Sequence, residues 1–186
     1  MIEGKNVIAV TSRKLCSRPF LEVFEDLAKK DLKTIVLREK DLTEEEYFQM
    51  AGQCMEICRA AGADLTLHHF IDVARRLGAK KIHLPYPVFL QEDGRWKDFD
   101  TVSTSIHKPE EAKEAQRLGA DFVFAGHVFQ TDCKKGLKPR GIDFLKEVVD
   151  SVSIPVYGIG GINEENFQQV INAGAAGGCI MSGFMK

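Results

Sequence analysis

The feature that most constrains the fold is a regular alternation of short apolar runs with longer amphipathic stretches. Residues 7–10 and 122–125, for example, are continuously apolar. Runs of this kind are typical of parallel strands, which are buried on both faces. The candidate strands are residues 7–12, 34–38, 65–68, 81–84, 102–106, 122–125, 155–158 and 178–181.

The stretches between these runs carry the start and stop signals of helices. Thr43 followed by Glu46 predicts a capping box at the start of one helix. Pro109, followed by acidic residues, predicts the first turn of another, and Asn163 predicts the start of a third. Glycines close the predicted helices and lead into the next strand, at Gly62, Gly119 and Gly174.

Eight strands alternating with helices indicate one right-handed α/β structure, either a closed barrel or a doubly wound open sheet. No G-x-G-x-x-G follows the first strand, and glycine-rich turns instead follow the last two strands. We therefore predict a compact (β/α)8 barrel, the TIM-barrel architecture, as a single domain over residues 1–186. Because the sequence reaches Lys186 soon after the last strand, we expect the eighth helix to be absent or truncated. The apolar strip left uncovered could be buried in a homo-oligomer.

Composition excludes several classes of protein. Lys and Arg number 25 against 27 Asp and Glu, a net charge of −2 that attracts neither nucleic acid nor an anionic membrane. The first apolar run, residues 7–10, is too short for a signal peptide, so we expect a cytoplasmic protein without membrane contact. The 5 cysteines are odd in number and scattered, which favours reduced thiols over disulfides.

The active site of a barrel lies at the carboxyl ends of its strands. His127 follows the sixth strand, where it could both take and give a proton. Gly160 and Gly161 after strand seven, with Ser182 and Gly183 after strand eight, suit a phosphate monoester, although plain tight turns would look similar. The other candidate substrate-binding residues at strand ends are Arg38, Lys40, Ser105, His107, Thr131 and Lys134.

Other residues at the strand ends can be explained without a role in binding or catalysis. Arg38 and Lys40 could form a solvated charged turn instead of an anion site. His68 and His69 are adjacent, so at most one of them faces the site, and mid-strand His83 is expected to be structural. The strand ends offer no close pair of carboxylates for Mg²⁺, which predicts no metal.

From the second strand to its end the chain resembles the thiamin phosphate synthase superfamily. The motifs that carry the resemblance are Leu37-Arg38-Glu39-Lys40, Ser105-Ile106-His107, Gly119-Ala120-Asp121, Ile159-Gly160-Gly161-Ile162 and Met181-Ser182-Gly183. The synthases place acidic residues after strands three and four, where this chain has His68-His69 and Pro85-Tyr86. The run from Gly126 to Gly136, with His127 and Thr131, looks like the thiazole tautomerase branch.

The resemblance implies an isomerase of thiamin biosynthesis that aromatises a carboxythiazole phosphate tautomer and needs no metal and no organic cofactor. His127 would move the proton, and Gly160, Gly161, Ser182 and Gly183 would hold the phosphate. Arg38, Lys40 and Lys134 would supply positive charge, while Ser105, His107 and Thr131 would orient the substrate.

Three rival functions stay open at this point. The first is a thiamin phosphate synthase that joins a pyrimidine pyrophosphate to a thiazole phosphate with Mg²⁺. The second is a non-catalytic protein that binds a phosphate ligand and has a regulatory role. The third, a phosphosugar isomerase or epimerase, ranks last because such enzymes usually pair carboxylates, or a Glu with a His, at strand ends.

Overall fold

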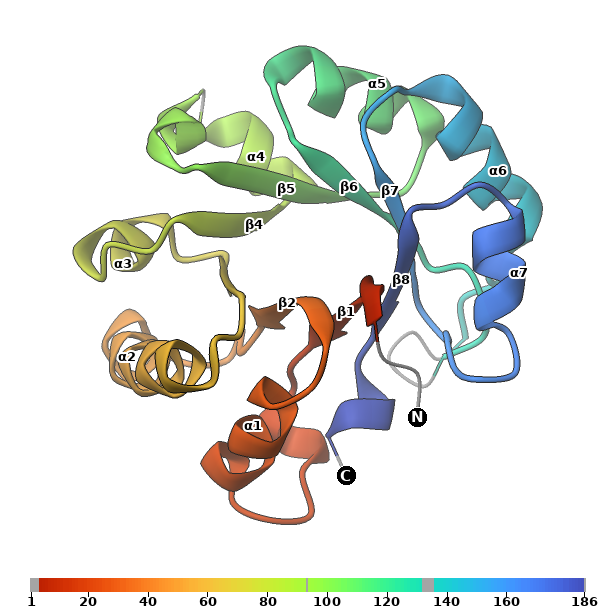
Figure 1. Ribbon diagram of the computed structural model, residues 1–186. Helices are drawn as coiled ribbons and strands as arrows, with labels where there is room; N and C mark the ends of the chain where they lie inside the picture. The colour runs from red at the N-terminus through yellow and green to blue at the C-terminus, as the bar shows by residue number, and fades with distance from the viewer. Residues whose placement is uncertain (1–3, 93, 132–135, 186) are drawn as a thin grey trace.

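The computed structural model describes residues 4–92, 94–131 and 136–185. Eight parallel strands close into a barrel in sequence order, and β8 pairs with β1 (Figure 1). The strands are β1 (Gly4–Val10), β2 (Leu32–Leu37), β3 (Leu65–His68), β4 (Lys81–Pro85), β5 (Thr101–Ile106), β6 (Phe122–Gly126), β7 (Val156–Ile159) and β8 (Gly177–Ile180). Each observed strand overlaps its predicted run, so the closed α/β barrel is confirmed.

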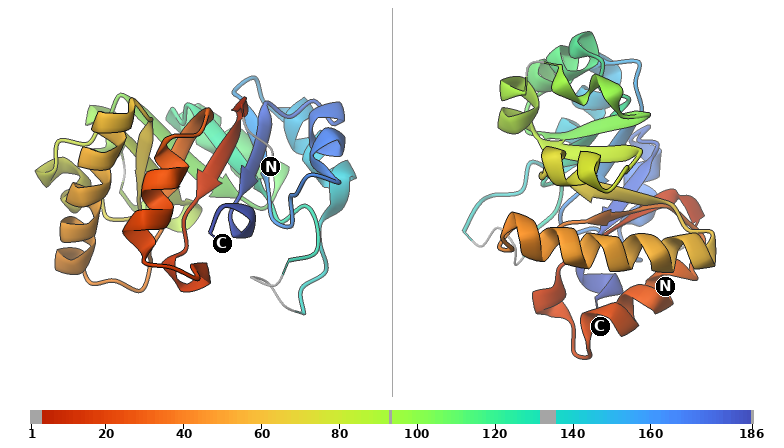
Figure 2. Two further views of the ribbon diagram at one scale, coloured as in Figure 1. Left: turned by 60° about the horizontal axis from the view of Figure 1, so that its bottom comes forward. Right: turned by 90° about the vertical axis from the view of Figure 1, so that its left-hand side faces the viewer.

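Helices surround the strands on the outside of the barrel (Figures 1 and 2). They are α1 (Phe20–Ala28), α2 (Glu44–Ala61), α3 (Ile71–Arg76), α4 (Tyr86–Gln91), α5 (Pro109–Leu118), α6 (Gly141–Ser151) and α7 (Phe167–Asn172). None of the helices in the described ranges is long and apolar enough to cross a membrane.

The predicted helix signals are confirmed for α2 and α5, whereas α7 begins later than predicted. The Thr43 hydroxyl accepts from the Glu46 amide at 3.3 Å, and the Glu46 carboxylate accepts from the Thr43 amide at 2.8 Å. Helix α7 begins at Phe167, four residues after Asn163. The Asn163 side chain accepts from the backbone amides of Glu165 and Asn166, and Asn163 O accepts from the Phe167 amide at 3.0 Å, so Asn163 caps the turn that leads into α7.

Successive side chains of a strand point to opposite faces of the sheet, and this divides the buried apolar residues into two clusters. Val7 and Ala9 of β1 belong to the large cluster between strands and helices. Ile8 and Val10 belong to a smaller cluster inside the barrel with Val36, Phe122, Phe124, Tyr157 and Cys179. Successive strand residues therefore point alternately outward and inward, as the geometry of a pleated strand requires.

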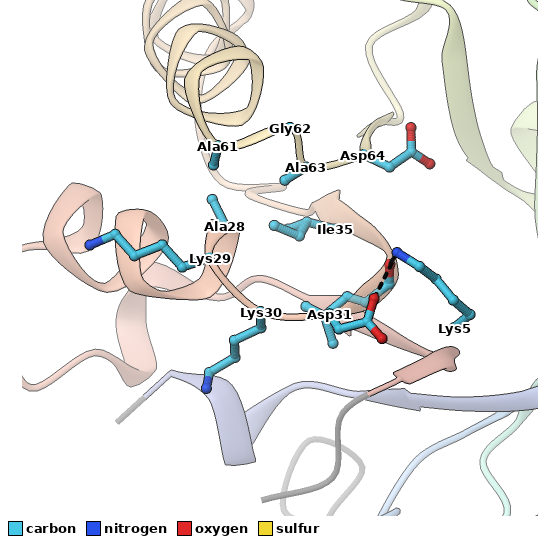
Figure 3. Close-up of a pocket in the computed structure, with 11 residues that line it drawn as sticks. Lys5, Ala28, Lys29, Lys30, Asp31, Ile35, Ala61, Gly62, Ala63 and Asp64 are labelled. Carbon is cyan, nitrogen blue, oxygen red and sulfur yellow. Dashed lines mark hydrogen bonds and ion pairs between the residues drawn. The ribbon is translucent and has the colours of Figure 1, made fainter.

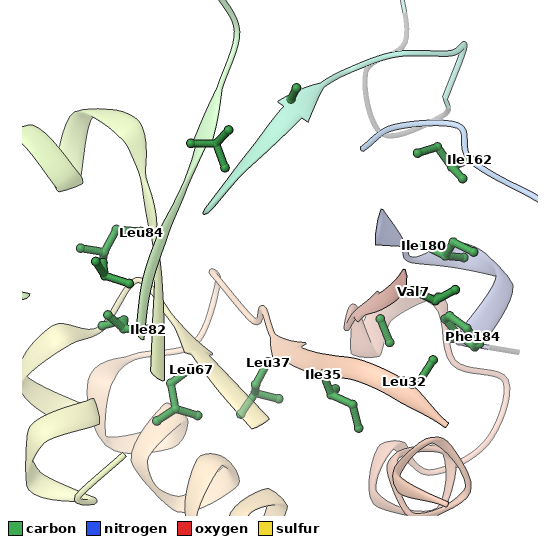
Figure 4. Packing of buried hydrophobic residues seen from close by; sticks show 14 of the residues in the cluster. Val7, Leu32, Ile35, Leu37, Leu67, Ile82, Leu84, Ile162, Ile180 and Phe184 are labelled. Atoms are coloured by element: carbon green, nitrogen blue, oxygen red, sulfur yellow. The ribbon is translucent and has the colours of Figure 1, made fainter. Parts of the chain in front are cut away.

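After β8 the described chain forms only a short 3-10 helix, Ser182–Phe184, in agreement with the expected lack of a full eighth helix. The expected uncovered apolar strip is wrong, because Phe184 and Met185 cover it. Phe184 is 5% exposed and packs in the outer cluster with Val7 and Ile180 (Figure 4). The Ser12 amide also donates to Met185 Sδ at 3.4 Å. The sequence-based reason for an oligomer is thereby removed.

We predict that Phe184→Ala destabilises the fold by about 3 kcal/mol, because it leaves a cavity beside β1 and β8. Leu137→Ala is the control, since Leu137 is 58% exposed. Urea unfolding at neutral pH measures both variants. Equal losses for the two would contradict the covering role of Phe184.

Candidate active site

The carboxyl ends of β6, β7 and β8 lie side by side. Gly126 of β6 pairs with Ile159 of β7, and Ile159 pairs with Cys179 of β8. The segments that follow these three strands therefore begin next to one another on the barrel rim. Gly160 and Gly161 follow β7 there, and the exposed residues Ser182 and Gly183 follow β8. The four residues predicted to hold a phosphate thus belong to neighbouring strand ends.

Gly160 and Gly161 also let the chain after β6 pack closely on the chain after β7. The Phe129 amide donates to Gly160 O at 3.0 Å. A Cβ on Gly161 would lie within 2.3 Å of Gln130 O, and a Cβ on Gly160 within 2.4 Å of His127 Cβ. These glycines therefore have a structural role that the sequence analysis did not foresee: they allow His127 to sit directly beside the β7 turn.

His127 is 6% exposed and follows a cis peptide bond after Gly126. Its Nε2 lies 3.4 Å from Leu137 O. Two bonds from Arg140 hold the carbonyl groups of Gly126 and His127. The Arg140 side-chain Nε donates to Gly126 O at 3.1 Å, and its amide donates to His127 O at 3.0 Å. Arg140 is a residue that the sequence analysis missed. Of the other predicted residues on this segment, Thr131 is half-buried and Lys134 lies outside the described residues.

The backbone of Arg38, after β2, is held by a buried hydrogen-bond network that the sequence analysis also missed. Glu39, 3% exposed, accepts from the Thr11 hydroxyl at 2.8 Å and from the Arg13 amide at 3.0 Å. The Thr11 hydroxyl in turn accepts from the Arg38 amide at 3.0 Å. Glu39 therefore joins the ends of β1 and β2 and fixes the backbone of Arg38. The alternation of Arg38, Glu39 and Lys40 could have predicted that Glu39 points away from the two cations.

The side of the barrel interior formed by β2 to β5 carries polar side chains. Thr34 and Thr66 share a hydrogen bond of 3.0 Å, and the His68 ring stacks on the His83 ring with centroids 5.7 Å apart. Of the two histidines at the end of β3, His68 is buried in this cluster and His69 is half-buried. His83 lies between the hydroxyls of Ser103 and Ser105, so Ser105 is placed inside the barrel mouth.

Both interior histidines are neutral. Burial, then the charge of Arg38, lowers the pKa of His83 to about 3. Burial is also the main cause that lowers the pKa of His68, followed by His83, Arg38, His69 and Lys40. Arg38 is half-buried and Lys40 is exposed. Their predicted anion-binding role, against a solvated charged turn, stays a prediction.

His107 follows β5 and is half-buried. Its backbone amide donates to the Glu111 carboxylate at 2.7 Å, and its Nδ1 lies 3.9 Å from the same oxygen. Glu111 thus holds the turn between β5 and α5. Among the described residues, no group of three or more His, Cys, Asp or Glu side chains could hold a metal ion. The rim carboxylates Glu39 and Glu111 are occupied by the contacts above.

A separate cavity of about 260 Å³ lies at the opposite end of the barrel, between the ends of α1 and α2 and the start of β2 (Figure 3). Lys5 and Asp31, which line it, form an ion pair of 2.8 Å. Asp64, on its other side, pairs with Lys81 at 2.6 Å. These contacts neutralise charges in its wall, and it is remote from His127 and the predicted phosphate site.

We predict that Glu39→Gln lowers the free energy of unfolding by about 2 kcal/mol, the scale of a lost hydrogen bond to a buried charge. It should also raise the KM for an anionic substrate, because Arg38 loses its support. Asp41→Asn is the control: Asp41 contacts Arg13 from the exposed side, where water screens the pair, so a much smaller loss is expected. Urea unfolding compares them, and a smaller loss for Glu39→Gln than for Asp41→Asn would contradict the network.

Acidification tests the neutral histidines. Because the folded pKa of His83 is about 3 against an ordinary 6.5, the unfolded chain binds more protons between these values. His83 therefore lowers stability progressively as the pH falls below 6.5, and has no such effect above it. We expect His83→Gln to lose less unfolding free energy than the wild type between pH 7 and pH 5, as measured by urea unfolding. An equal loss in both proteins would refute a neutral buried His83.

Comparisons with known proteins agree with this geometry. A family model described as thiamine monophosphate synthase matches residues 7–184. A protein of Aquifex aeolicus named putative thiamine-phosphate synthase 2 is 33% identical over 186 residues, covering 100% of both chains. The thiamine-phosphate synthase of Fusobacterium nucleatum is 32% identical over 183 residues, covering 97% of this chain and 89% of that one. The solved thiamine phosphate pyrophosphorylase from Pyrococcus furiosus has a TM-score of 0.79 at 27% identity, covering 96% and 87%.

The names of these relatives favour the synthase reaction, which the sequence analysis placed second, over the tautomerase reaction. They do not distinguish a tautomerase branch. The similarity extends over almost the whole barrel, from β1 to the short helix after β8. This chain belongs to the thiamine monophosphate synthase family.

Proposed function

We propose that this chain acts on a phosphorylated thiazole in thiamine biosynthesis and aromatises it by a proton transfer that needs no metal. The observation that carries the proposal is the position of His127. It is a buried imidazole beside the β7 turn, at the strand end next to the predicted phosphate site. An imidazole can accept a proton and return it near neutral pH, which is what an isomerisation requires.

The phosphate would bind where β7 and β8 end. Barrels commonly bind phosphate between the loops that follow these two strands. Gly160 and Gly161 leave their backbone free of side chains, and Ser182 adds a hydroxyl on the neighbouring segment. A phosphate held there would place the attached ring near His127.

The carboxylate of the substrate would face the positive side of the rim. Arg38 and Lys40 follow β2 at the rim and are among the causes that lower the pKa of His68, which supports this arrangement. Removing a proton from the ring carbon that bears the carboxylate builds up negative charge, and fixed positive charge stabilises it. His127 would take that proton and deliver one to the exocyclic carbon, so that the atoms balance without a co-reactant.

Coupling of a thiazole phosphate to a pyrimidine pyrophosphate is the second candidate, and the names of the relatives favour it. The resemblance attaches Mg²⁺ to that reaction, and Mg²⁺ is usually held by one or two carboxylates together with substrate phosphates. In the described part of the rim, Glu39 and Glu111 are turned to Thr11, Arg13 and the His107 amide. The described residues therefore do not fit that metal, and for this reason we place isomerisation first.

A proton NMR time course distinguishes the two reactions. We expect the wild type to aromatise the carboxythiazole phosphate tautomer in the presence of EDTA, and His127→Gln to be slower by about 10²-fold or more. His69→Gln is the matched control, because it makes the same change at a histidine to which no role is assigned. Unfolding midpoints establish that each variant is folded.

A parallel reaction supplies the pyrimidine pyrophosphate, the thiazole phosphate and Mg²⁺. Coupling that depends on Mg²⁺, with no aromatisation in EDTA, would overturn the proposal in favour of the synthase. Binding of the thiazole phosphate without either reaction would indicate the non-catalytic alternative.

A further inference from the structure

The polar cluster inside the barrel contains a histidine that the proposed reaction does not use. His83 Nδ1 lies 2.8 Å from Ser103 Oγ, and His83 Nε2 lies 2.8 Å from Ser105 Oγ. The ring stacks on Phe124 with centroids 4.2 Å apart, and the residue is 2% exposed. Both nitrogens are therefore occupied, and the plane of the ring is fixed.

A neutral imidazole donates from one nitrogen and accepts at the other. His83 is kept neutral by burial and by the charge of Arg38, which together lower its pKa. The two serines must consequently play opposite parts. One hydroxyl donates its proton to the ring, and the other accepts a proton from it.

The surroundings decide which serine accepts. Ser103 is completely buried, whereas Ser105 is half-buried and lies two residues nearer the carboxyl end of β5. Arg38 places positive charge on the same part of the interior. The positive charge favours an anionic ligand group at this point, and a hydroxyl can bind an anionic oxygen only by donating to it. The Ser105 proton is available for this only when His83 Nε2 carries the other one.

We propose that His83 is a positioning residue, held as the Nε2–H tautomer, that turns the Ser105 hydroxyl proton toward an anionic oxygen of the bound substrate. The buried Ser103 hydroxyl donates to Nδ1, on the side of the ring away from Ser105, and so fixes the tautomer. The identity of the anion rests on the proposed function, whereas the tautomer does not.

Nitrogen NMR of protein labelled with ¹⁵N-histidine tests the tautomer without any substrate. The chain has 5 histidines, and the His83 signals are those that His83→Gln removes. We expect a protonated Nε2 and an unprotonated Nδ1 between pH 6 and pH 8. A protonated Nδ1, or a ring protonated on both nitrogens, would overturn the proposal whether or not the enzyme turns over a thiazole phosphate.

Two substitutions test the consequence for the substrate. The amide nitrogen of His83→Gln can occupy the place of Nε2 and donate to Ser105, whereas the shorter His83→Asn reaches only the place of Nδ1. We expect His83→Asn and Ser105→Ala to raise KM about tenfold with little change in kcat, and His83→Gln to stay near the wild type. Adding His83→Asn to Ser105→Ala should cost nothing more.

The outcome that would overturn this second part is equal KM for His83→Gln and His83→Asn while both remain folded by their unfolding midpoints. A wild type that turns over neither candidate substrate but shows the Nε2–H tautomer would refute the proposed function and leave the placement of the Ser105 proton intact.

Discussion

The joint between β8 and β1 is the constraint on which the rest of the molecule depends. Val7 pairs with Gly178, and a Cβ on neighbouring Gly177 would lie within 1.8 Å of Asn6 O. Only a glycine lets the two backbones approach this closely. Once the sheet is closed, the alternation of side chains divides every strand into an inner and an outer set. Closure therefore fixes the outer core, the inner cluster and the ring of strand ends together.

The inner set changes character around the barrel. Ile8, Val10, Phe122 and Tyr157 form an apolar cluster on the side of β1, β6 and β7, while His68, His83 and Ser103 bring polar groups to the interior from β3, β4 and β5. The histidines are uncharged because a buried imidazolium next to Arg38 is unfavourable. In the proposed site, Arg38 and Lys40 would supply the positive charge at the mouth. The Arg38 amide donates to the Thr11 hydroxyl, which in turn donates to the buried Glu39 carboxylate.

Much of the fold could be predicted because its signals are local. Apolar runs gave the strands, and Thr43 with Glu46 gave the start of α2. Asn163 caps a turn as its residue type suggests, but the regular helix begins only at Phe167, a boundary that a capping signal alone does not fix. The covering of β1 and β8 by Phe184 and Met185 depends on packing between opposite ends of the sequence, which no local pattern reports.

The site divides in the same way. The positions of His127, the β7 glycines and Ser182 at one edge follow from strand order, which the sequence supplied. The support of Arg38 by Thr11 and Glu39, and of His127 by Arg140, joins residues whose partners become neighbours only in the closed barrel. His83 was expected to be structural, and the structure shows that its two ring nitrogens bond the hydroxyls of Ser103 and Ser105.

The most direct test of the central claim is isomerisation of the carboxythiazole phosphate tautomer in D₂O with EDTA, followed by mass and NMR analysis of the product. The proton that His127 delivers to the exocyclic carbon comes from solvent, or exchanges with solvent while it is on the imidazole, so in D₂O it is a deuteron. The account predicts aromatic product with one deuterium on the formerly exocyclic carbon, formed at a rate that depends on His127. Absence of aromatic product above the uncatalysed level would contradict it.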